Sequence, residues 1–584
     1  MIDRWITDDE PSVRFPLYTR ANADEVGPEP FSPLGWTLGW QLGCIPGVAD
    51  GFVSFGIVRA TELRPGLPEV FGNWGGYFYN QLSITRLMGV RMPGASPEAM
   101  DLAYFGDHPG VPPYVAHPED DDPELSAKLG ETMAWVMGTA DHPRMREEAV
   151  ASRAVRASRP EMASLSDAGL IAYARSMGPR IRAAWGPYCE VCLGASLGPG
   201  AIQVICAGVG RPGDAIALMS AIGGVESAQA SLAIWDLGRI VASSPQLTAL
   251  FDGAPDGLLD RLRAISTTDA TRFAFHFDAL ISEFGHRGPN EWDMLPDSWE
   301  TRPVLALGMI ERIRHQRDER SPRLAAERAT LVRERLAEEL LELVSNDPVT
   351  HQALQAALSS AASFLALREL GKSTCIRLIN EAKVALFELG RRGELRGQLD
   401  AARQIFMLRE QELNGFLDDP HGWRVELCER EHTFGLLKNL EPPYIVNGND
   451  GVPSISKWPP RGATGRSRAV AVGDVLQGGP GAPGIAEGRA RIVDDPADPG
   501  DLQPDDIMIV HTTDPSWAPL FLSVGGVVCD VGAVVSHASI VSREVGVPCA
   551  VSVVNATSSI PDGARVRIDG TTGTVTVLEL YEAR

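Results

Sequence analysis

One histidine, His537, stands at the junction between an apolar, glycine-containing segment that reads as a strand and an amphipathic segment that reads as a helix. Because serine is a favoured helix N-cap and Ser536 directly precedes it, we expect His537 in the first helical turn. There, unbonded backbone N–H groups and the positive end of the helix dipole favour an anion and lower the pKa of an imidazole. A neutral imidazole with one unprotonated nitrogen is a nucleophile. The local pattern therefore predicts a phosphoryl-accepting histidine, with a capped helix that contains a chance histidine as an equal alternative.

A second group of reactive side chains lies in residues 284–293, after a run that reads as a helix. An arginine there is suited to grip phosphate with two hydrogen bonds, and a histidine can take a proton from a hydroxyl that attacks phosphorus. On spacing alone, a helix-ending turn whose charges pair with one another is the favoured interpretation. The candidates are His286, Arg287, Glu291 and Asp293.

The C-terminal segment resembles the phosphohistidine swivelling domain of the PEP-utilising enzyme family, also called the phosphoenolpyruvate synthase-like family. The motifs that carry the resemblance lie at 481–492, 513–517, 532–548 and 566–573. The resemblance implies that His537 is the residue that becomes phosphorylated. It also implies supporting roles for Ser536, Gly532 and Arg543.

Segment 284–293 is similar to a signature in the central helical domain of the phenylphosphate synthase and rifampicin phosphotransferase branches of that family, and so is the later segment around Arg368 and Lys372. In those enzymes the domain holds the phosphoryl acceptor. The resemblance implies that His286 is a general base. The substrate-binding residues that it implies are Arg287, Glu291, Asp293, Arg368 and Lys372.

The fold class expected from these observations is multidomain α plus α/β. A mainly helical domain is expected over 1–445, irregular over 1–75, and a small β/β/α swivelling domain over 468–584. The stretch 446–467 is rich in Gly, Pro and Ser without periodicity and is predicted to be a flexible linker. A helix is expected from Pro322, with Ser321 as N-cap, to about residue 346. Alternation over 565–569 and 574–578 predicts a hairpin.

Composition limits the function classes. The chain has 584 residues, 44% of them hydrophobic, and a net charge of −23, which argues against nucleic-acid binding. The start lacks a signal-sequence pattern, and the longest apolar stretch, 521–535, is too short to span a membrane, so we expect a cytoplasmic protein without a membrane partner. The eight cysteines do not suggest disulfides. The acidic run 119–122 reads as a solvated loop, and no metal site is predicted.

The family members that this chain resembles carry an ATP-grasp domain, and nothing in this sequence resembles one or matches a Walker-type phosphate loop. The expectation is a split enzyme, in which a separate ATP-grasp subunit binds ATP and Mg²⁺ and charges His537. The expected acceptor is a phenol or alkylphenol, as in the two-component cresol-phosphorylating enzymes. Three alternatives stay open: another alcohol or an antibiotic as acceptor, a non-enzymatic phosphocarrier, and an inactive paralogue.

Overall fold

The computed structural model describes residues 2–64, 66–105, 110–253, 255–462, 470–496 and 498–580. The last residues of the predicted linker, 463–467, and the first two of the predicted swivelling domain therefore lie outside the described residues. The chain divides into two compact units. Unit 1 comprises Met1–Gly194, Trp292–Leu295 and Thr374–Gly465, and unit 2 comprises Ala195–Glu291, Pro296–Ser373 and Arg466–Arg584.

Unit 1 is mainly helical and carries a four-stranded sheet with the strand order β2-β3-β1-β4. The predicted irregular start is only partly so, because a π-helical segment, Gly35–Cys44, runs directly into α2, Ile45–Phe55. The long helix α16, Pro348–Leu395, belongs to both units. The other principal elements of unit 1 are β1 (Leu17–Thr19), α1 (Ala23–Val26), β2 (Phe71–Trp74), β3 (Tyr77–Gln81), α3 (Leu82–Arg91), α4 (Pro97–Phe105), α5 (Pro123–Gly138), α6 (Pro143–Ala157), α7 (Asp167–Gly194), α17 (Leu413–Asp418), α18 (Arg424–Leu437) and β4 (Ile445–Asn447).

Glycines at every fourth position let the π-helical segment and α2 approach α7 closely. A Cβ atom at Gly43, Gly47 or Gly51 would lie 2.4–2.7 Å from side-chain atoms of α7. Positions four apart share one helix face, so the three glycines form one contact stripe. Among the described residues, Asp167–Gly208 is the one helical stretch long and apolar enough to cross a membrane. This is weak evidence for a membrane span, because buried core helices meet the same test.

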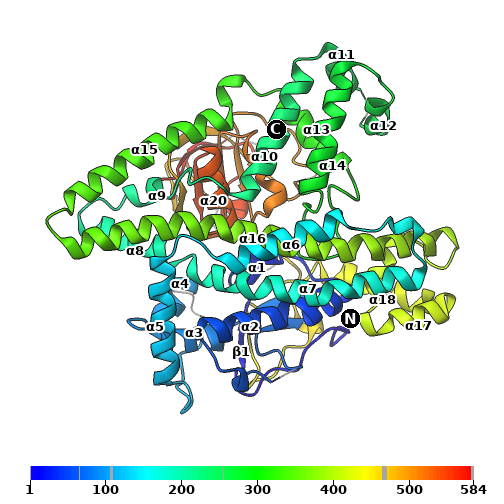
Figure 1. Ribbon diagram of the computed structural model, residues 1–584, viewed down its shortest axis with the longest axis horizontal. Coiled ribbons are helices and arrows are strands. Elements are labelled where there is room, and N and C mark those ends of the chain that lie inside the picture. The colour runs from blue at the N-terminus through cyan, green and yellow to red at the C-terminus, as the bar shows by residue number, and fades with distance from the viewer. Residues whose placement is uncertain are drawn as a thin grey trace. The chain divides into compact units, whose positions relative to one another are not determined.

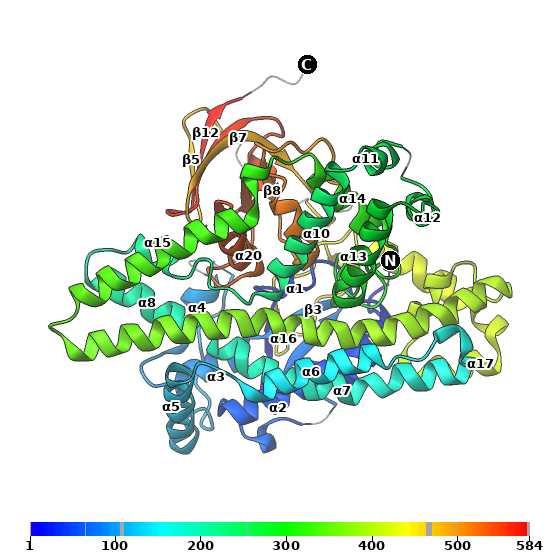
Figure 2. The same cartoon turned by 45° about the horizontal axis from the view of Figure 1, so that its top comes forward.

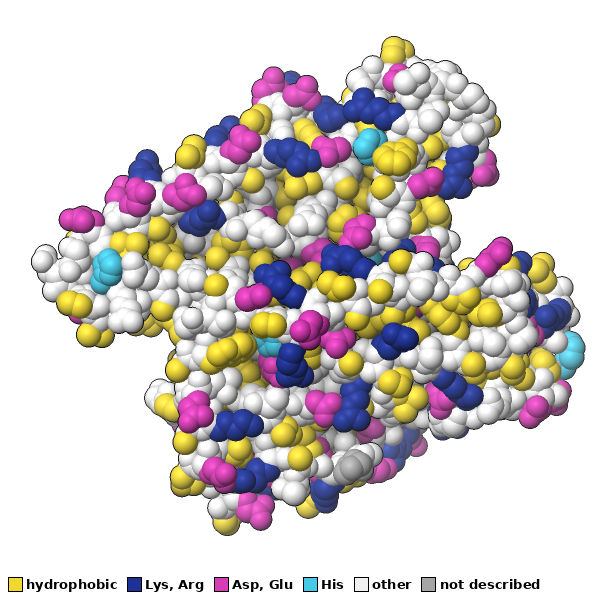
Figure 3. Space-filling model, in the orientation of Figure 1, with side chains coloured by type: hydrophobic (Ala, Val, Ile, Leu, Met, Phe, Trp, Pro, Cys, Tyr) yellow, Lys and Arg dark blue, Asp and Glu magenta, His cyan; other side chains and the backbone are white. Residues whose placement is uncertain are grey.

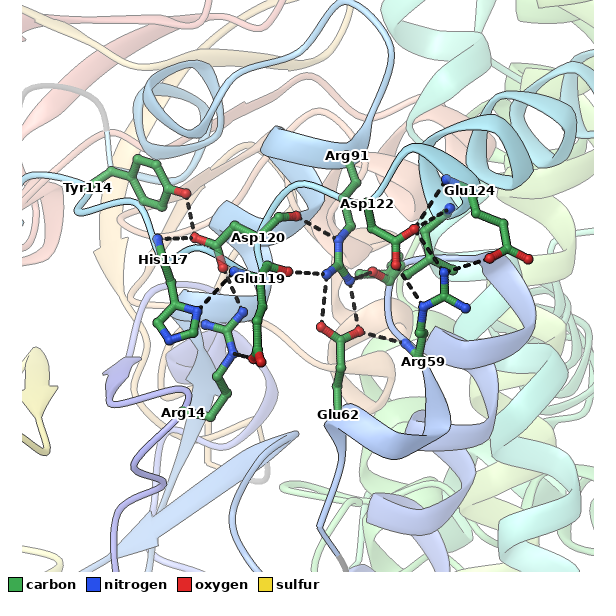
Figure 4. A network of polar contacts seen from close by, with 12 residues as sticks. Arg14, Arg59, Glu62, Arg91, Tyr114, His117, Glu119, Asp120, Asp122 and Glu124 are labelled. Carbon is green, nitrogen blue, oxygen red and sulfur yellow. Dashed lines mark hydrogen bonds and ion pairs between the residues drawn. The ribbon is translucent and has the colours of Figure 1, made fainter.

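The acidic run 119–122 is a solvated loop only in part, because Glu119 and Asp121 are exposed while arginines hold the other residues (Figure 4). The buried guanidinium of Arg91 donates to two backbone carbonyls of the run. Asp120 pairs with Arg14 at 2.7 Å, and the Asp122 carboxylate accepts two backbone N–H groups at the start of α5. The run therefore has a structural role in unit 1, where it binds Arg91 and Arg14 and caps the start of α5.

Unit 2 begins with helices. The predicted helix from Pro322 is confirmed as α15, Pro322–Leu343, with Ser321 at the N-cap but without a side-chain capping bond. Acidic and basic side chains interleave along its exposed face (Figure 3). The other principal helices are α8 (Leu197–Gly208), α9 (Asp214–Leu218), α10 (Glu226–Ala242), α11 (Pro245–Phe251), α12 (Leu258–Arg263), α13 (Thr268–Phe284) and α14 (Val304–Arg314).

The C-terminal part of unit 2 is an eight-stranded mixed sheet with the order β5-β12-β11-β7-β8-β9-β10-β6 (Figure 2). Strands β7 to β10 are parallel, and β11 and β12 form the predicted hairpin. The elements are β5 (Val475–Gln477), β6 (Gly479–Ala482), β7 (Ile485–Ile492), β8 (Ile507–Val510), α19 (Ala518–Phe521), β9 (Gly526–Cys529), α20 (His537–Val545), β10 (Cys549–Val551), α21 (Ala556–Ser559), β11 (Arg565–Asp569) and β12 (Thr574–Glu579). A mainly helical region followed by a small sheet domain confirms the predicted fold class.

Alternation along the strands gives this sheet two buried faces. Ile507 and Ile509 of β8 enter an apolar cluster that also holds residues of β11 and β12. Met508 and Val510 point to the other face, where they join α20 and the apolar sides of α10, α13 and α14 in one continuous core. Helix α20 thus packs between the sheet and the helical part of unit 2, with α10 beside it (Figure 1).

Candidate active site

His537 is the first residue of α20, the helix that connects the parallel strands β9 and β10. Ser536 occupies the N-cap position with extended backbone angles, as predicted, but its side chain makes no capping bond to the helix. The Ser536 hydroxyl lies 3.4 Å from that of Ser539 instead. The predicted place of His537 in the first helical turn is confirmed, and the capping comes from the backbone geometry alone.

The imidazole of His537 is paired with a buried carboxylate of α16. His537 Nδ1 lies 3.0 Å from Glu369 Oε2, and the two side chains are 2% and 0% exposed. The hydroxyl of Ser227, at the start of α10, donates to the same carboxylate oxygen at 2.7 Å. The phosphoryl-accepting candidate is therefore inserted among side chains of the helical part of unit 2.

Burial and pairing act in opposite directions on these two groups. Burial lowers the pKa of His537, and Glu369 opposes that shift only in part. Burial alone would raise the pKa of Glu369, but His537, Lys372 and Arg368 together hold it well below its usual value. The pair is therefore an ionised carboxylate that accepts a hydrogen bond from a neutral imidazole, with the ring proton on Nδ1.

The loop after α13 carries the Gly-His-Arg-Gly sequence and is held by backbone hydrogen bonds. The N–H of Trp299 donates to the carbonyl of Arg287 at 2.7 Å. A Cβ atom at Gly288 would lie 2.1 Å from the backbone oxygen of Asp297, so only glycine permits this approach. The second glycine of the sequence thus sets the path of the loop that presents Arg287.

Arg287 and Glu291 form a fully buried ion pair, with 3.0 Å between Nη1 and Oε1. Within the described part of the chain, the Nε and Nη2 atoms of Arg287 and the Oε2 atom of Glu291 have no hydrogen-bond partner. Burial raises the pKa of Glu291 to about 7, although Arg287 and Lys372 oppose the shift. Unsatisfied buried donors and acceptors are costly and call for a ligand or water. This pair can therefore present N–H donors to a phosphoryl oxygen and an acceptor to a hydroxyl.

His286 is also fully buried and belongs to a hydrogen-bonded chain. The hydroxyl of Ser373 donates to Glu226 at 2.6 Å, and the same oxygen lies 2.9 Å from His286 Nε2. Because the serine proton is used toward Glu226, His286 Nε2 must carry the donated proton, which leaves the lone pair on Nδ1. A neutral imidazole in this tautomer can accept a proton at Nδ1.

The remaining predicted binding residues belong to different units of the structure. Arg368 and Lys372 lie four residues apart on α16, on either side of Glu369 in the sequence, and both contribute positive charge to that carboxylate. Asp293 belongs instead to unit 1, where its carboxylate accepts the N–H and the hydroxyl of Ser32. The described contacts therefore give Asp293 a local structural role at Ser32.

The predicted supporting residues surround the start of α20. Arg543 is buried and donates to the carbonyl of Val534 at 2.8 Å, which ties the helix to the loop before His537. Burial lowers the pKa of Arg543 to about 10. Gly532 lies against Val551, where an added Cβ would meet side-chain atoms at 3.1 Å.

Further contacts join the sheet domain to the helical part of unit 2. The Glu544 carboxylate accepts the backbone N–H groups of Ile222 and Gly223 at 2.8 and 3.1 Å. Asp514 accepts the N–H of Asn290, in the Gly-His-Arg-Gly loop, at 2.9 Å. The first contact holds α20 against residues 222–223, and the second holds the segment at Asp514 against the loop that carries Arg287 and Glu291.

Four residues of the site were not among the predicted site residues: Glu226, Ser227, Glu369 and Ser373. Glu369 and Ser373 carry a usable signal, since they adjoin Arg368 and Lys372 at helical spacing on α16. Glu226 and Ser227 lie far away in the sequence, at the start of α10, and no local pattern marks them.

Comparisons with known proteins agree with this geometry. Residues 191–369 match the model of the rifampicin phosphotransferase fourth domain, and residues 502–573 match that of the PEP-utilising enzyme mobile domain. Rifampicin phosphotransferases of Bacillus cereus and Streptomyces sviceus are 27% and 29% identical over 60% and 62% of this chain. An uncharacterised protein of Mycobacterium tuberculosis is 26% identical over 97% of it.

The chain spans 40% of the length of those rifampicin phosphotransferases and 62% of the mycobacterial protein. The two matched domains are the two halves of unit 2 that meet at His537. The resemblance read from the sequence motifs is confirmed. The chain is thus similar to PEP-utilising enzymes over the mobile domain and to rifampicin phosphotransferases over their fourth domain.

Proposed function

We propose that this chain carries the phosphohistidine of an ATP-dependent phosphotransferase and that His537 passes its phosphoryl group to a small-molecule hydroxyl. One observation supports this most strongly. The imidazole of His537, at the start of the mobile-domain helix α20, is seated against Glu369 in the buried cluster that also holds Arg287 and Glu291. Positioning and charge stabilisation account for most of the catalysis in phosphoryl transfer, and this cluster offers both.

The docked arrangement serves the second half of the reaction. The His537 ring is 2% exposed there, so charging by ATP requires a second arrangement in which the mobile domain has left the cluster. We propose that the domain turns about the predicted linker, 446–467, beyond its first two residues, which belong to β4 of the unit 1 sheet. The ATP-grasp module that charges His537, with its ATP and Mg²⁺, is proposed to be a separate subunit. Among the described residues, no group of three or more His, Cys, Asp or Glu is arranged to hold a metal.

Transfer to the acceptor needs a proton acceptor for its hydroxyl. His286, held by Ser373 in the tautomer with a lone pair on Nδ1, is the proposed general base. Arg287, with two N–H groups lacking partners, is proposed to bind the phosphoryl oxygens. Arg368 and Lys372 are proposed to add positive charge. We place the whole reaction in the cytoplasm.

A phenol or alkylphenol is the proposed acceptor, because its anionic oxygen is a good nucleophile that His286 can generate. Tryptophans could line an apolar pocket for such an acceptor, but Trp36 and Trp40 stack on each other at 5.5 Å in the core, and both are fully buried. They therefore add no support for a phenol. A second candidate, an antibiotic hydroxyl, is favoured by the similarity to rifampicin phosphotransferases.

The test is reconstitution with the co-purified natural partner, followed by an acceptor screen. Phenol, p-cresol, rifampicin and simple alcohols would each be supplied with ATP, and phosphorylated product would be measured together with AMP. Product from one acceptor class with one AMP formed per product supports the proposal and identifies the class. Charging of His537 without product from any acceptor would favour the phosphocarrier alternative.

A further inference from the structure

Glu369 contacts one of the two ring nitrogens of His537, Nδ1. Its Oε2 atom accepts from His537 Nδ1 at 3.0 Å and from the Ser227 hydroxyl at 2.7 Å. Because Nδ1 is engaged in this way, chemistry at phosphorus is directed to the other ring nitrogen, Nε2. The carboxylate comes from α16 in the helical part of unit 2, while the imidazole comes from the mobile domain.

The charges that face this pair come from several elements. Positive charge is contributed by Arg368 and Lys372 of α16 and by Arg287 of the loop after α13. Two nearby carboxylates are engaged elsewhere: Glu291 pairs with Arg287, and Glu226 accepts the hydroxyl of Ser373. On α20 itself, Arg543 and Glu544 are directed to backbone groups of Val534, Ile222 and Gly223. Glu369 is thus the carboxylate in direct contact with the ring.

We propose that Glu369 is a positioning residue that activates phosphohistidine 537 in the docked arrangement. This inference rests on the proposed function and deepens it. When phosphorus is bound to Nε2, a carboxylate at Nδ1 favours the form of the ring that is protonated at Nδ1. Such a ring departs as a neutral imidazole, whereas a ring without that proton would have to depart as an anion.

The acceptor oxygen forms its bond to phosphorus, and the P–Nε2 bond breaks with its electron pair on Nε2. Nδ1 keeps its proton in the hydrogen bond to Glu369, and the hydroxyl proton of the acceptor passes to His286. The products are a phosphate ester and the neutral His537 that is paired with Glu369 in the structure.

Activation would be coupled to docking, because Glu369 lies outside the mobile domain. A phosphohistidine in transit would lack the carboxylate and would lose its phosphoryl group slowly to water. At the acceptor site, the same group would become reactive.

The test uses the full chain, charged chemically with potassium phosphoramidate so that no partner subunit is needed. Phosphohistidine decay would be followed by ³¹P NMR from pH 5.5 to 8.5, in water and with p-cresol. His537→Ala defines the signal that belongs to position 537. Glu369→Gln keeps the side-chain size and an oxygen for Ser227. Glu190→Gln, in a buried Glu–His pair of unit 1 with 2.8 Å to His142, is the matched control.

Glu369→Gln should be phosphorylated normally, but its phosphohistidine should decay at least about tenfold more slowly than that of the wild type at pH 7.5. Its decay should also fall off at a lower pH than in the wild type, because the ring loses its Nδ1 proton more easily. Glu369→Asp should restore the wild-type pH profile at a reduced rate, and Glu190→Gln should match the wild type.

Wild-type decay and an unshifted pH profile in Glu369→Gln would overturn the inference and leave the proposed function intact. If Glu369→Gln does not fold, Glu369→Asp provides the test. A decay that falls off at a lower pH than in the wild type would then overturn the inference, because the carboxylate of Asp would have failed to keep the proton on Nδ1. Equal labelling of the wild type and His537→Ala would overturn the proposed function as well.

Discussion

Glu544 offers a quantitative test of how the mobile domain is held against the helical part of unit 2. Its carboxylate is 9% exposed and accepts the backbone N–H groups of Ile222 and Gly223 at 2.8 and 3.1 Å. Glu544→Gln keeps the shape but offers one oxygen to two donors, so one N–H loses its partner. An unsatisfied buried donor costs about 1–3 kcal/mol, and hydrogen bonds to charged groups contribute about 1.5–3 kcal/mol.

A loss of about 2–3 kcal/mol corresponds to a roughly 30- to 150-fold shift toward the undocked arrangement. The assay is amide hydrogen exchange, read by mass spectrometry on peptides that cover 220–224 and 537–545. Both peptides should exchange faster by that factor in Glu544→Gln, while the core strands of the sheet keep their protection. Charging of His537 should become faster, because the ring is more often out of the cluster.

Glu487→Gln is the matched control, since Glu487 is a carboxylate of the same domain that is 43% exposed and lies 3.7 Å from Arg565. Exposed pairs of this kind contribute little. Its exchange should equal that of the wild type. Unchanged exchange in Glu544→Gln would refute the reasoning that this carboxylate holds the docked arrangement.

Three further predictions follow from the site. Gly288→Ala should lower the free energy of unfolding by about 2 kcal/mol or more in chemical denaturation, because its Cβ would lie 2.1 Å from the Asp297 carbonyl oxygen; a neutral result would mean that the loop can shift. Burial raises the pKa of Glu291 to about 7, so folding is disfavoured once the carboxyl group ionises. The melting temperature of the wild type should therefore fall relative to that of Glu291→Gln as the pH rises from 5 to 8. A difference in melting temperature that stays constant over this range would contradict that pKa. His286→Ala should charge normally but transfer to the acceptor roughly 10²- to 10⁴-fold more slowly in single-turnover assays, and a normal rate would exclude it as the base.

The swivelling domain could be predicted well from the sequence because its signals are local. The Ser-His step at the start of α20 and the β11–β12 hairpin each lie within a few residues of one another. Alternation and turn residues fix such elements without long-range information. The order of the eight strands could not be read this way, because it depends on pairings between distant segments.

The buried cluster around His537 was only half predictable for the same reason. His286, Arg287 and Glu291 share one loop, and Arg368 and Lys372 share one helix turn, so spacing brings each set together. Nothing local links His537 to Glu369, which lie 168 residues apart, or His286 to Ser373, which lie 87 apart. Asp293 follows Glu291 by only two residues but belongs to unit 1, where it is hydrogen-bonded to Ser32 of the same unit. Proximity in the sequence alone was therefore misleading for Asp293.

The central claim is that His537 carries phosphorus, and mapping phosphohistidine on the natively expressed protein tests it most directly. The protein would be purified rapidly at alkaline pH, to preserve the acid-labile phosphohistidine, and its peptides would be sequenced by mass spectrometry beside those of His537→Gln. The account predicts a phosphoryl group on the imidazole of residue 537 that disappears in the variant and when p-cresol or the true acceptor is added. Phosphohistidine at other positions only, or none in wild-type protein that has been exposed to ATP and its partner, would contradict it.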